Sequence, residues 1–247
     1  MVSAAPQDQW RLLDVQAHDT RLTQLAHRQR TLPEHAEVDK LESRLKTVAD
    51  QLVAVHTVAS DVARELAKAE ADVELVRQRA ARDQGRLDSG LGSAKDLQAI
   101  QHELESLAKR KSVLEDAELE VMERLEAAQA RVGEVEGERE RLTAELAEVT
   151  ARRDRLIADV DDEADRERQG RANAAAGLPK ELLALYEKVR EQAGGIGAAR
   201  LYQRRCDGCR LELNTTDINR IRAAADDTVI RCEECRRILV RTPDSGL

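Results

Sequence analysis

The sequence predicts a mainly α fold, a long antiparallel coiled-coil helical hairpin followed by a small C-terminal β domain. Three observations predict it. The chain of 247 residues is 36% charged and 1% aromatic and contains no phenylalanine, which is typical of long helices rather than of a broad globular core. Apolar residues recur with gaps of three and four over most of the chain. All four cysteines lie in its last fifth.

The first arm of the hairpin is predicted from a heptad seam. Its thirteen positions are all apolar: Val38, Leu41, Leu45, Val48, Leu52, Val55, Ala59, Val62, Leu66, Ala69, Val73, Val76 and Ala80. Such a seam indicates left-handed coiled-coil packing. Pro33 lies before it, and because proline interrupts helical hydrogen bonding we expect a kink near residues 31–33.

Three glycines, Gly85, Gly90 and Gly92, predict the tip of the hairpin at about residues 85–94. Ser93 offers an N-cap for the returning helix, with Asp96 in its first turn. The hairpin as a whole is expected to span residues 1–175.

Heptads resume in the second arm from Ile100 to Leu156, although Lys111, Glu118, Arg139 and Arg153 interrupt one of its two rows. A short loop between long helices implies an antiparallel pair. With the tip near residue 90, the numbers of facing residues should sum to about 180. An arm of about 75 residues would be on the order of 110 Å long.

A shorter amphipathic helix is predicted over residues 178–193, and a glycine-rich segment then separates it from a C-terminal domain at residues 196–247. The chain has only three aromatic residues, Trp10, Tyr186 and Tyr202. The predicted register leaves two alternatives for them: a shared core where the hairpin meets the C-terminal domain, or three unrelated surface rings.

The cysteines form two identical knuckles, Cys206-x-x-Cys209 and Cys232-x-x-Cys235. A gap of two residues lets both sulfurs of a knuckle face one ion, and two knuckles complete a tetrahedron. We therefore predict one structural Zn²⁺ in a C4 zinc ribbon. Two disulfides are disfavoured because the chain has no signal peptide and a cytosolic composition, and no βαβ pattern suggests a redox pair. Spacing alone does not distinguish zinc from iron.

The ribbon has few apolar residues, so its core cannot offset the ordering entropy of some fifty residues without metal. Zinc binding is worth roughly 10–16 kcal/mol in small finger peptides. We expect chelation to unfold residues 200–242 while the helicity of the hairpin survives.

The pair Cys206 and Cys209, followed by the run from Cys232 to Leu239, resembles a bacterial C4-type zinc-ribbon family with a long N-terminal coiled-coil hairpin. The stretch from Lys95 to Glu103 is similar to the family's segment after the hairpin tip. The resemblance covers essentially the whole chain, and the Ala- and Arg-rich composition suits an actinobacterial member. It implies a role as an adaptor or chaperone.

The chain departs from the family at the second knuckle. Arg236 stands where the family often has glycine, and Val240 stands where it often has tyrosine. We therefore expect a more strained knuckle turn.

Two functions are compatible with these features. The first is a non-enzymatic adaptor that docks protein partners through the ribbon, the hairpin or both. The second is RNA or DNA binding by the ribbon, where residues 196–247 hold ten arginines and eight acids. The candidate contact residues, for nucleic acid or for a protein partner, are Arg204, Arg205, Arg210, Arg236 and Arg237.

No catalytic motif stands out, and all five histidines lie in the predicted helical arms. We expect no enzyme activity. We also expect a cytoplasmic protein without a membrane span, because no stretch of 18 apolar residues occurs. The sequence leaves the partner and the choice between monomer and dimer open.

Overall fold

The computed structural model describes residues 2–247 and confirms a mainly α fold with a small C-terminal sheet. The elements, in chain order, are α1 (Pro6–Arg30), α2 (Pro33–Asp88), α3 (Ala94–Ala175), α4 (Lys180–Gln192), β1 (Ala198–Tyr202), β2 (Arg205–Cys206), α5 (Thr215–Ala223), β3 (Ile230–Arg231), β4 (Ile238–Val240) and the 3₁₀ helix η1 (Pro243–Ser245). None of the helices in this described part is long and apolar enough to cross a membrane.

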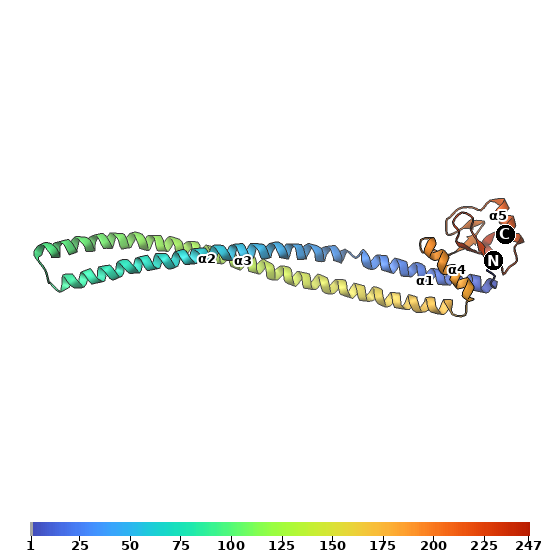
Figure 1. Ribbon diagram of the computed structural model, residues 1–247, viewed down its shortest axis with the longest axis horizontal. Helices are drawn as coiled ribbons and strands as arrows, with labels where there is room; N and C mark the ends of the chain where they lie inside the picture. Colours follow the sequence, from blue (N-terminus) through green and yellow to red (C-terminus); the bar gives the residue numbers. More distant parts are fainter. Residues whose placement is uncertain (1) are drawn as a thin grey trace. The chain divides into compact units, whose positions relative to one another are not determined.

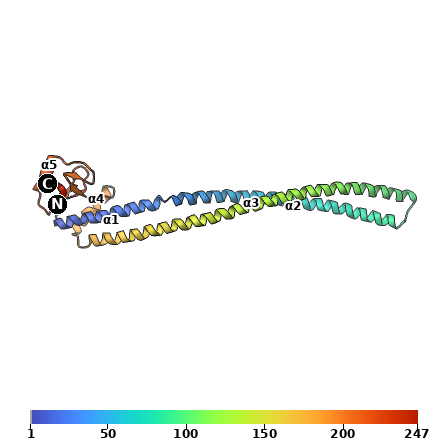
Figure 2. The same cartoon turned by 180° about the vertical axis from the view of Figure 1, so that it is seen from behind.

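The chain forms two compact units. We call Ala36–Thr150 the hairpin unit, and we call the chain up to His35 together with Ala151–Leu247 the ribbon unit. In the hairpin unit, α2 and α3 lie side by side and run in opposite directions (Figures 1 and 2). Their core joins Val38 and Leu45 of α2 to Leu142 and Val149 of α3. All thirteen predicted seam positions of the first arm are buried or half-buried.

The helix breaks lie where backbone geometry requires them. Helix α1 ends at Arg30, and α2 begins at Pro33. Helix α2 continues through Gly85 to Asp88, so the loop at the tip covers only residues 89–93. The Ser93 hydroxyl accepts a hydrogen bond from the Asp96 backbone N–H at 3.2 Å, and the Asp96 carboxylate accepts one from the Ser93 N–H at 3.1 Å. This reciprocal pair caps the start of α3.

The register of the hairpin differs from the predicted one by a heptad. Arg79 pairs with Glu103 at 2.6 Å, and Arg77 pairs with Glu115 at 2.6 Å. The residue numbers in these pairs sum to 182 and 192, which brackets a value of about 187 rather than the predicted 180. Ion pairs of this kind flank a coiled-coil seam on its two sides. A shift of seven residues keeps every apolar residue in the seam, so the heptad pattern does not distinguish the two registers.

The ribbon unit contains a four-stranded sheet with strand order β2-β1-β4-β3. Strand β1 pairs in parallel with β4 and antiparallel with β2, and β3 pairs antiparallel with β4. The first residues of the chain join this unit: Ser3 forms an antiparallel bridge with Thr228, and the Ala4 N–H donates to the Asp227 carbonyl at 2.8 Å. Both ends of the chain therefore belong to the ribbon unit (Figure 1).

The sheet has a core on each face, because alternate residues of a strand point to opposite sides. Ala198, Ile238 and Val240 pack with Leu12 of α1 and residues of α4 in one cluster. A second cluster packs the other face against α5 and the cysteines; it contains Ala199, Leu201, Cys206, Leu213, Ile218, Ile221, Cys232 and Leu239. The ribbon thus shares one core with the helices and has a second core beside the knuckles.

A buried polar network also joins the helices to the ribbon. The Tyr186 hydroxyl donates to the Asp19 carboxylate at 2.7 Å, and the Arg171 guanidinium donates to it at 2.7 Å. Burial, together with the negative charge of Asp19, raises the pKa of Tyr186. The Gln16 side-chain oxygen accepts from the Gly197 backbone N–H at 2.6 Å, immediately before β1. Helix α1 thereby fixes the point at which the ribbon begins.

The three aromatic residues do not form a shared core. Tyr186 is fully buried, whereas Trp10 and Tyr202 are exposed by 44% and 36%. Of the three, only Tyr186 belongs to the apolar core that the helices share with the ribbon. The heptad shift contributes to this result, since His18 rather than Trp10 lies against Gly170 of α3.

Candidate metal centre

The first knuckle begins where β2 ends. Cys206 is the last residue of β2 and is fully buried. The chain then turns back, so that the Arg210 N–H donates to the Cys206 carbonyl at 2.6 Å. Arg210 has a φ of 62°, a left-handed conformation that glycine adopts at less cost. The turn directs the sulfurs of Cys206 and Cys209 to the same side.

The second knuckle repeats this geometry after β3. The Arg236 N–H donates to the Cys232 carbonyl at 2.9 Å, and Arg236 also has a φ of 62°. The strain expected at Arg236 is therefore present, and Arg210 shares it. The Cys232 N–H donates to the Arg237 carbonyl at 2.9 Å, which continues the β3–β4 ladder into the knuckle.

The four sulfurs have the arrangement that a tetrahedral zinc ion requires. All four lie within 4.8 Å of one another. The Cys206 and Cys235 sulfurs are 3.8 Å apart, and those of Cys209 and Cys232 are 3.9 Å apart. Zn–S bonds of about 2.3 Å place sulfurs about 3.8 Å apart at the corners of a tetrahedron, whereas a disulfide requires about 2.05 Å. The spacing fits the predicted four-cysteine metal site and does not fit two disulfides.

The surroundings of the Cys206 and Cys232 sulfurs affect their thiolate form in two opposite directions. Burial raises the pKa of the Cys206 and Cys232 thiols. The backbone N–H groups of Gly208 and Cys209 hydrogen-bond to the Cys206 sulfur and lower that pKa in turn, and the second knuckle repeats the arrangement around Cys232. These N–H groups stabilise the thiolate form that zinc binds. Four sulfur ligands leave no open coordination position, which is the mark of a structural site.

The candidate contact arginines divide into two groups. Arg204, Arg205, Arg210 and Arg236 are exposed, and their role as contacts stays a prediction. Arg237 is half-buried, and its guanidinium donates to the carbonyls of Ala193, Ile196 and Gly208 at 2.8–3.2 Å. Arg237 therefore ties the first knuckle to the segment after α4. No local sequence pattern distinguishes it from its neighbours.

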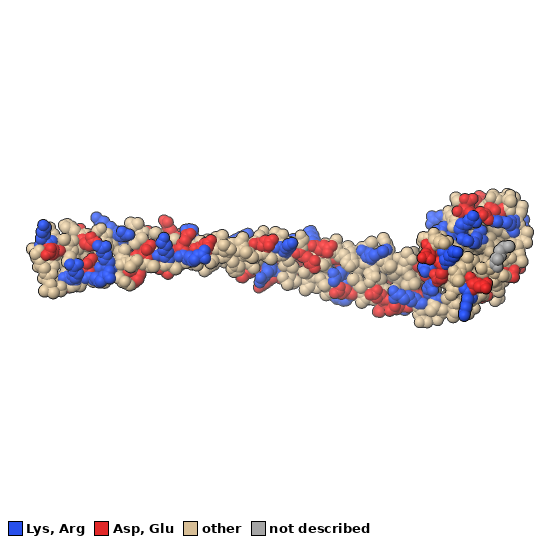
Figure 3. Space-filling model, viewed as in Figure 1, with Lys and Arg blue, Asp and Glu red and all other residues tan. Residues whose placement is uncertain are grey.

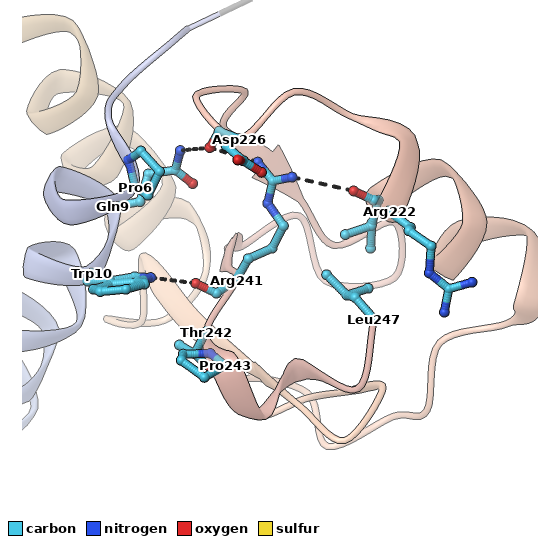
Figure 4. Close-up of a pocket in the computed structure, with 10 residues that line it drawn as sticks. Pro6, Gln9, Trp10, Arg222, Asp226, Arg241, Thr242, Pro243 and Leu247 are labelled. Atoms are coloured by element: carbon cyan, nitrogen blue, oxygen red, sulfur yellow. Dashed lines mark hydrogen bonds between the residues drawn. The ribbon is translucent and has the colours of Figure 1, made fainter.

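The contacts of Trp10 with the ribbon have no counterpart among the patterns of the sequence. Its indole N–H donates to the Arg241 carbonyl at 2.6 Å, and the amide of Gln9 donates to the Asp226 carbonyl at 3.2 Å. These residues line a pocket of about 440 Å³ (Figure 4). The Arg241 guanidinium donates to several carbonyls after α5, including that of Ala225 at 2.7 Å, and so holds the end of the helix in place.

Comparison with known proteins identifies both parts of the chain. The family model of the CT398-like coiled coil hairpin domain matches residues 15–194. The model of the C4-type zinc ribbon domain matches residues 205–239, which contain the four cysteines. Together with the positions of the four sulfurs, this match confirms the prediction of one structural zinc ion.

Mycobacterial proteins are among the relatives of this chain, in agreement with its Ala- and Arg-rich composition. Rv2229c of Mycobacterium tuberculosis is 37% identical over 230 residues, which is 93% of this chain and 94% of that protein. ML1638 of Mycobacterium leprae is 30% identical over 216 residues, 87% of this chain and 93% of that protein. A solved structure from Mycobacterium smegmatis has 37% identity and a TM-score of 0.84, covering 98% of this chain and all of that one. CT398 from Chlamydia trachomatis has a TM-score of 0.64 at 14% identity, covering 96% of this chain and 98% of that one, and shares the fold.

Proposed function

The chain belongs to the CT398-like coiled coil hairpin family, and from that premise we propose that it is a non-enzymatic, chaperone-like adaptor that docks a protein partner. Its zinc ion stabilises the ribbon fold. A closed shell of four sulfurs offers no position for a substrate, which supports a structural rather than a catalytic role.

The observation that carries the proposal is the exposed apolar surface of the hairpin unit. Of the eleven large hydrophobic side chains exposed among residues 2–247, seven lie in this unit: Val53, Val58, Leu75, Leu91, Val113, Leu119 and Met122. The thirteen positions of the first seam already provide its packing core. Most of these side chains lie singly along the two helices, which is ordinary for a protein surface, but Leu119 and Met122 are neighbours that line one hollow. Neighbouring exposed apolar side chains of this kind are typical of a surface that binds another protein.

The test is recovery of partners by the tagged full-length protein. We expect the wild type to retain at least one protein in stoichiometric amount after a high-salt wash, because apolar contacts are insensitive to screening. A Cys206→Ser/Cys209→Ser variant separates the two surfaces: partners lost only in that variant bind the ribbon, and partners retained bind the hairpin. Recovery of nucleic acid and no protein by the wild type would contradict the proposal.

A second function, RNA or DNA binding, is favoured by one hollow on the ribbon. Tyr202, Arg205 and Arg210 line it together with Gln203 and Asp207, and its volume is about 420 Å³. The Arg200 guanidinium lies over one face of the Tyr202 ring, 4.6 Å from its centroid, and the other face could stack on a base while Arg205 and Arg210 contact phosphates. Asp207 also lines this hollow, however, and Figure 3 shows acidic and basic side chains intermingled on one face of the ribbon unit, which weakens attraction for a polyanion.

Salt dependence decides this second candidate. If the hollow binds single-stranded RNA, affinity should fall steeply with salt, and Arg205→Ala/Arg210→Ala should reduce the log–log salt slope by about 1.4, since each phosphate contact contributes about 0.7. Arg222→Ala is the matched control, because this exposed arginine lies outside the hollow. Equal slopes for the double variant and the control would exclude the hollow as the binding site.

A further inference from the structure

Leu119 and Met122 form an exposed apolar patch on α3 within the hairpin unit. Their side chains are 57% and 47% exposed. With Leu66 of α2 and Leu125 of α3 they line a shallow hollow of about 310 Å³ between the two helices. Both residues lie outside the predicted seam rows, so the packing of α2 on α3 does not account for them.

The rim of this hollow is acidic. Glu123 and Glu126 line it, and no Lys or Arg does so. Arg124 is the arginine next to them in sequence, and it is bound to Glu65 at 2.9 Å. Among the described residues, no ion pair involves Glu123 or Glu126. We call Leu119, Met122, Glu123 and Glu126 the α3 patch.

The geometry of the α3 patch fits a helix. Leu119, Met122, Glu126 and Gln129 follow one another at spacings of three and four, so they share one face of α3. Gly133 continues this face, and a Cβ placed there would meet nothing within 4 Å. A third helix can approach closely along such a face and lie in the groove between two helices. The flexible thioether of Met122 adapts to the side chains of a partner.

We propose that the α3 patch docks a basic amphipathic helix of a protein partner. The apolar side of that helix lies on Leu119 and Met122, and its Lys or Arg residues lie beside Glu123 and Glu126. The proposal rests on the adaptor function and assigns it a surface and a partner chemistry. Electrostatic complementarity of this kind raises association rates and excludes wrong partners.

The negative charges of Glu123 and Glu126 disfavour binding of a second copy of the chain or of nucleic acid at the α3 patch. A second copy of the chain that packed its α3 patch against this one would bring Glu123 and Glu126 of both copies together, and these carboxylates would repel each other. Nucleic acid would be repelled by the same groups. The surface is thus distinct from the hollow that favours RNA on the ribbon.

The experiment measures fluorescence anisotropy of a labelled peptide of about 15 residues, built of Leu and Lys with leucines spaced to form one helical face, titrated with the full-length protein. We expect binding that weakens at least about tenfold with Leu119→Ser/Met122→Ser and with Glu123→Gln/Glu126→Gln. A scrambled peptide of the same composition should bind at least about tenfold more weakly than the amphipathic one.

Glu140→Gln/Glu145→Gln is the matched control, because it removes the same charge from exposed positions of α3 outside the patch. Wild-type affinity in both patch variants, absence of binding by the wild type, or equal binding of the scrambled peptide would overturn the proposal. A dimer that dissociates in Leu119→Ser/Met122→Ser, measured by sedimentation, would assign the patch to a second copy and overturn it as well.

Partner recovery distinguishes a wrong docking surface from a wrong adaptor function. A natural partner that stays bound to Leu119→Ser/Met122→Ser as tightly as to the wild type overturns the α3 patch and leaves the adaptor function in place. A wild type that recovers no protein overturns both.

Discussion

Removal of the zinc ion is expected to unfold the C-terminal part of the ribbon unit and to leave helices α1–α3 folded. The core beside the knuckles contains only eight buried residues, and two of them are metal ligands, Cys206 and Cys232. Zinc binding of roughly 10–16 kcal/mol is comparable to the entire stability of a typical domain, about 5–15 kcal/mol. A core of this size cannot replace it.

The number of helical residues in α5 determines how much the circular dichroism signal should fall on chelation. Helix α5 is the only helix packed in the core beside the knuckles, and it holds nine of the 185 α-helical residues among the described ones. Chelation should therefore reduce the helical signal in circular dichroism by only about 5%. Trp10 gives a second signal, because the single tryptophan of the chain donates to the Arg241 carbonyl at 2.6 Å.

The assay combines a zinc chelator with thiol titration, tryptophan emission and hydrogen exchange. We expect four reactive thiols, a red-shifted emission and loss of protection at the amides of α5. Two results would refute the reasoning. Protected α5 amides in a protein with four free thiols would show that the ribbon folds without metal, and a loss of more than a quarter of the helical signal would show that the hairpin depends on it.

Three further changes have defined expectations. Gly133→Ala should stabilise the hairpin by about 0.5–1 kcal/mol, because the added Cβ meets nothing within 4 Å. Gly197→Ala should instead destabilise the ribbon unit by about 1–3 kcal/mol, because its Cβ would lie 2.7 Å from the Tyr186 carbonyl oxygen; effects of the same sign in urea unfolding would contradict this contrast. Arg237→Ala should lower the free energy of unfolding of the ribbon unit by about 1–3 kcal/mol, because it leaves three carbonyls without their donor. The control Arg222→Ala, at an exposed position, should lower it by less than about 0.5 kcal/mol. Equal thermal midpoints for the two variants would contradict this expectation.

The features that the sequence predicted well depend on local patterns. Burial along the first arm follows the three-four spacing from Val38 to Ala80, and all thirteen positions are buried or half-buried. The knuckles follow from two C-x-x-C spacings, which constrain the sulfurs whatever the rest of the chain does. Both signals depend on spacings of three or four residues, which are set by the local chain.

The register of the hairpin depends on the tip loop and on cross-arm contacts, which no heptad specifies. We predicted a helix break at Gly85, but α2 continues to Asp88, since a single glycine costs a helix only about 1 kcal/mol. Ion pairs such as Arg79 with Glu103 then fix the alignment of α2 with α3 one heptad away from the predicted register. A prediction from sequence would need to compare such pairs in each of the registers that the seam allows.

The buried polar contacts between α1 and the ribbon could not be predicted from the sequence for a different reason. Its residues are polar, and a polar residue on a charged helix is expected to face solvent. Gln9, Gln16 and Asp19 are instead 2–7% exposed, because the ribbon, more than 170 residues away in the chain, supplies donors and acceptors for two of them. The C-terminal domain therefore includes α1 as a structural part, although α1 lies at the opposite end of the sequence.

These contacts can be tested with two substitutions of the same chemistry on one helix. Gln16→Leu removes the oxygen that accepts a hydrogen bond from the Gly197 N–H at 2.6 Å. A buried donor left without a partner costs about 1–3 kcal/mol, so the free energy of unfolding of the ribbon unit should fall by that amount and the amides of β1 should exchange faster. Gln24→Leu, at an exposed position of α1, should change it by less than about 0.5 kcal/mol. If both variants retained wild-type protection in β1, the hydrogen bond from the Gly197 N–H to Gln16 would not stabilise the ribbon, and the apolar contacts of α1 would be the ones that hold it.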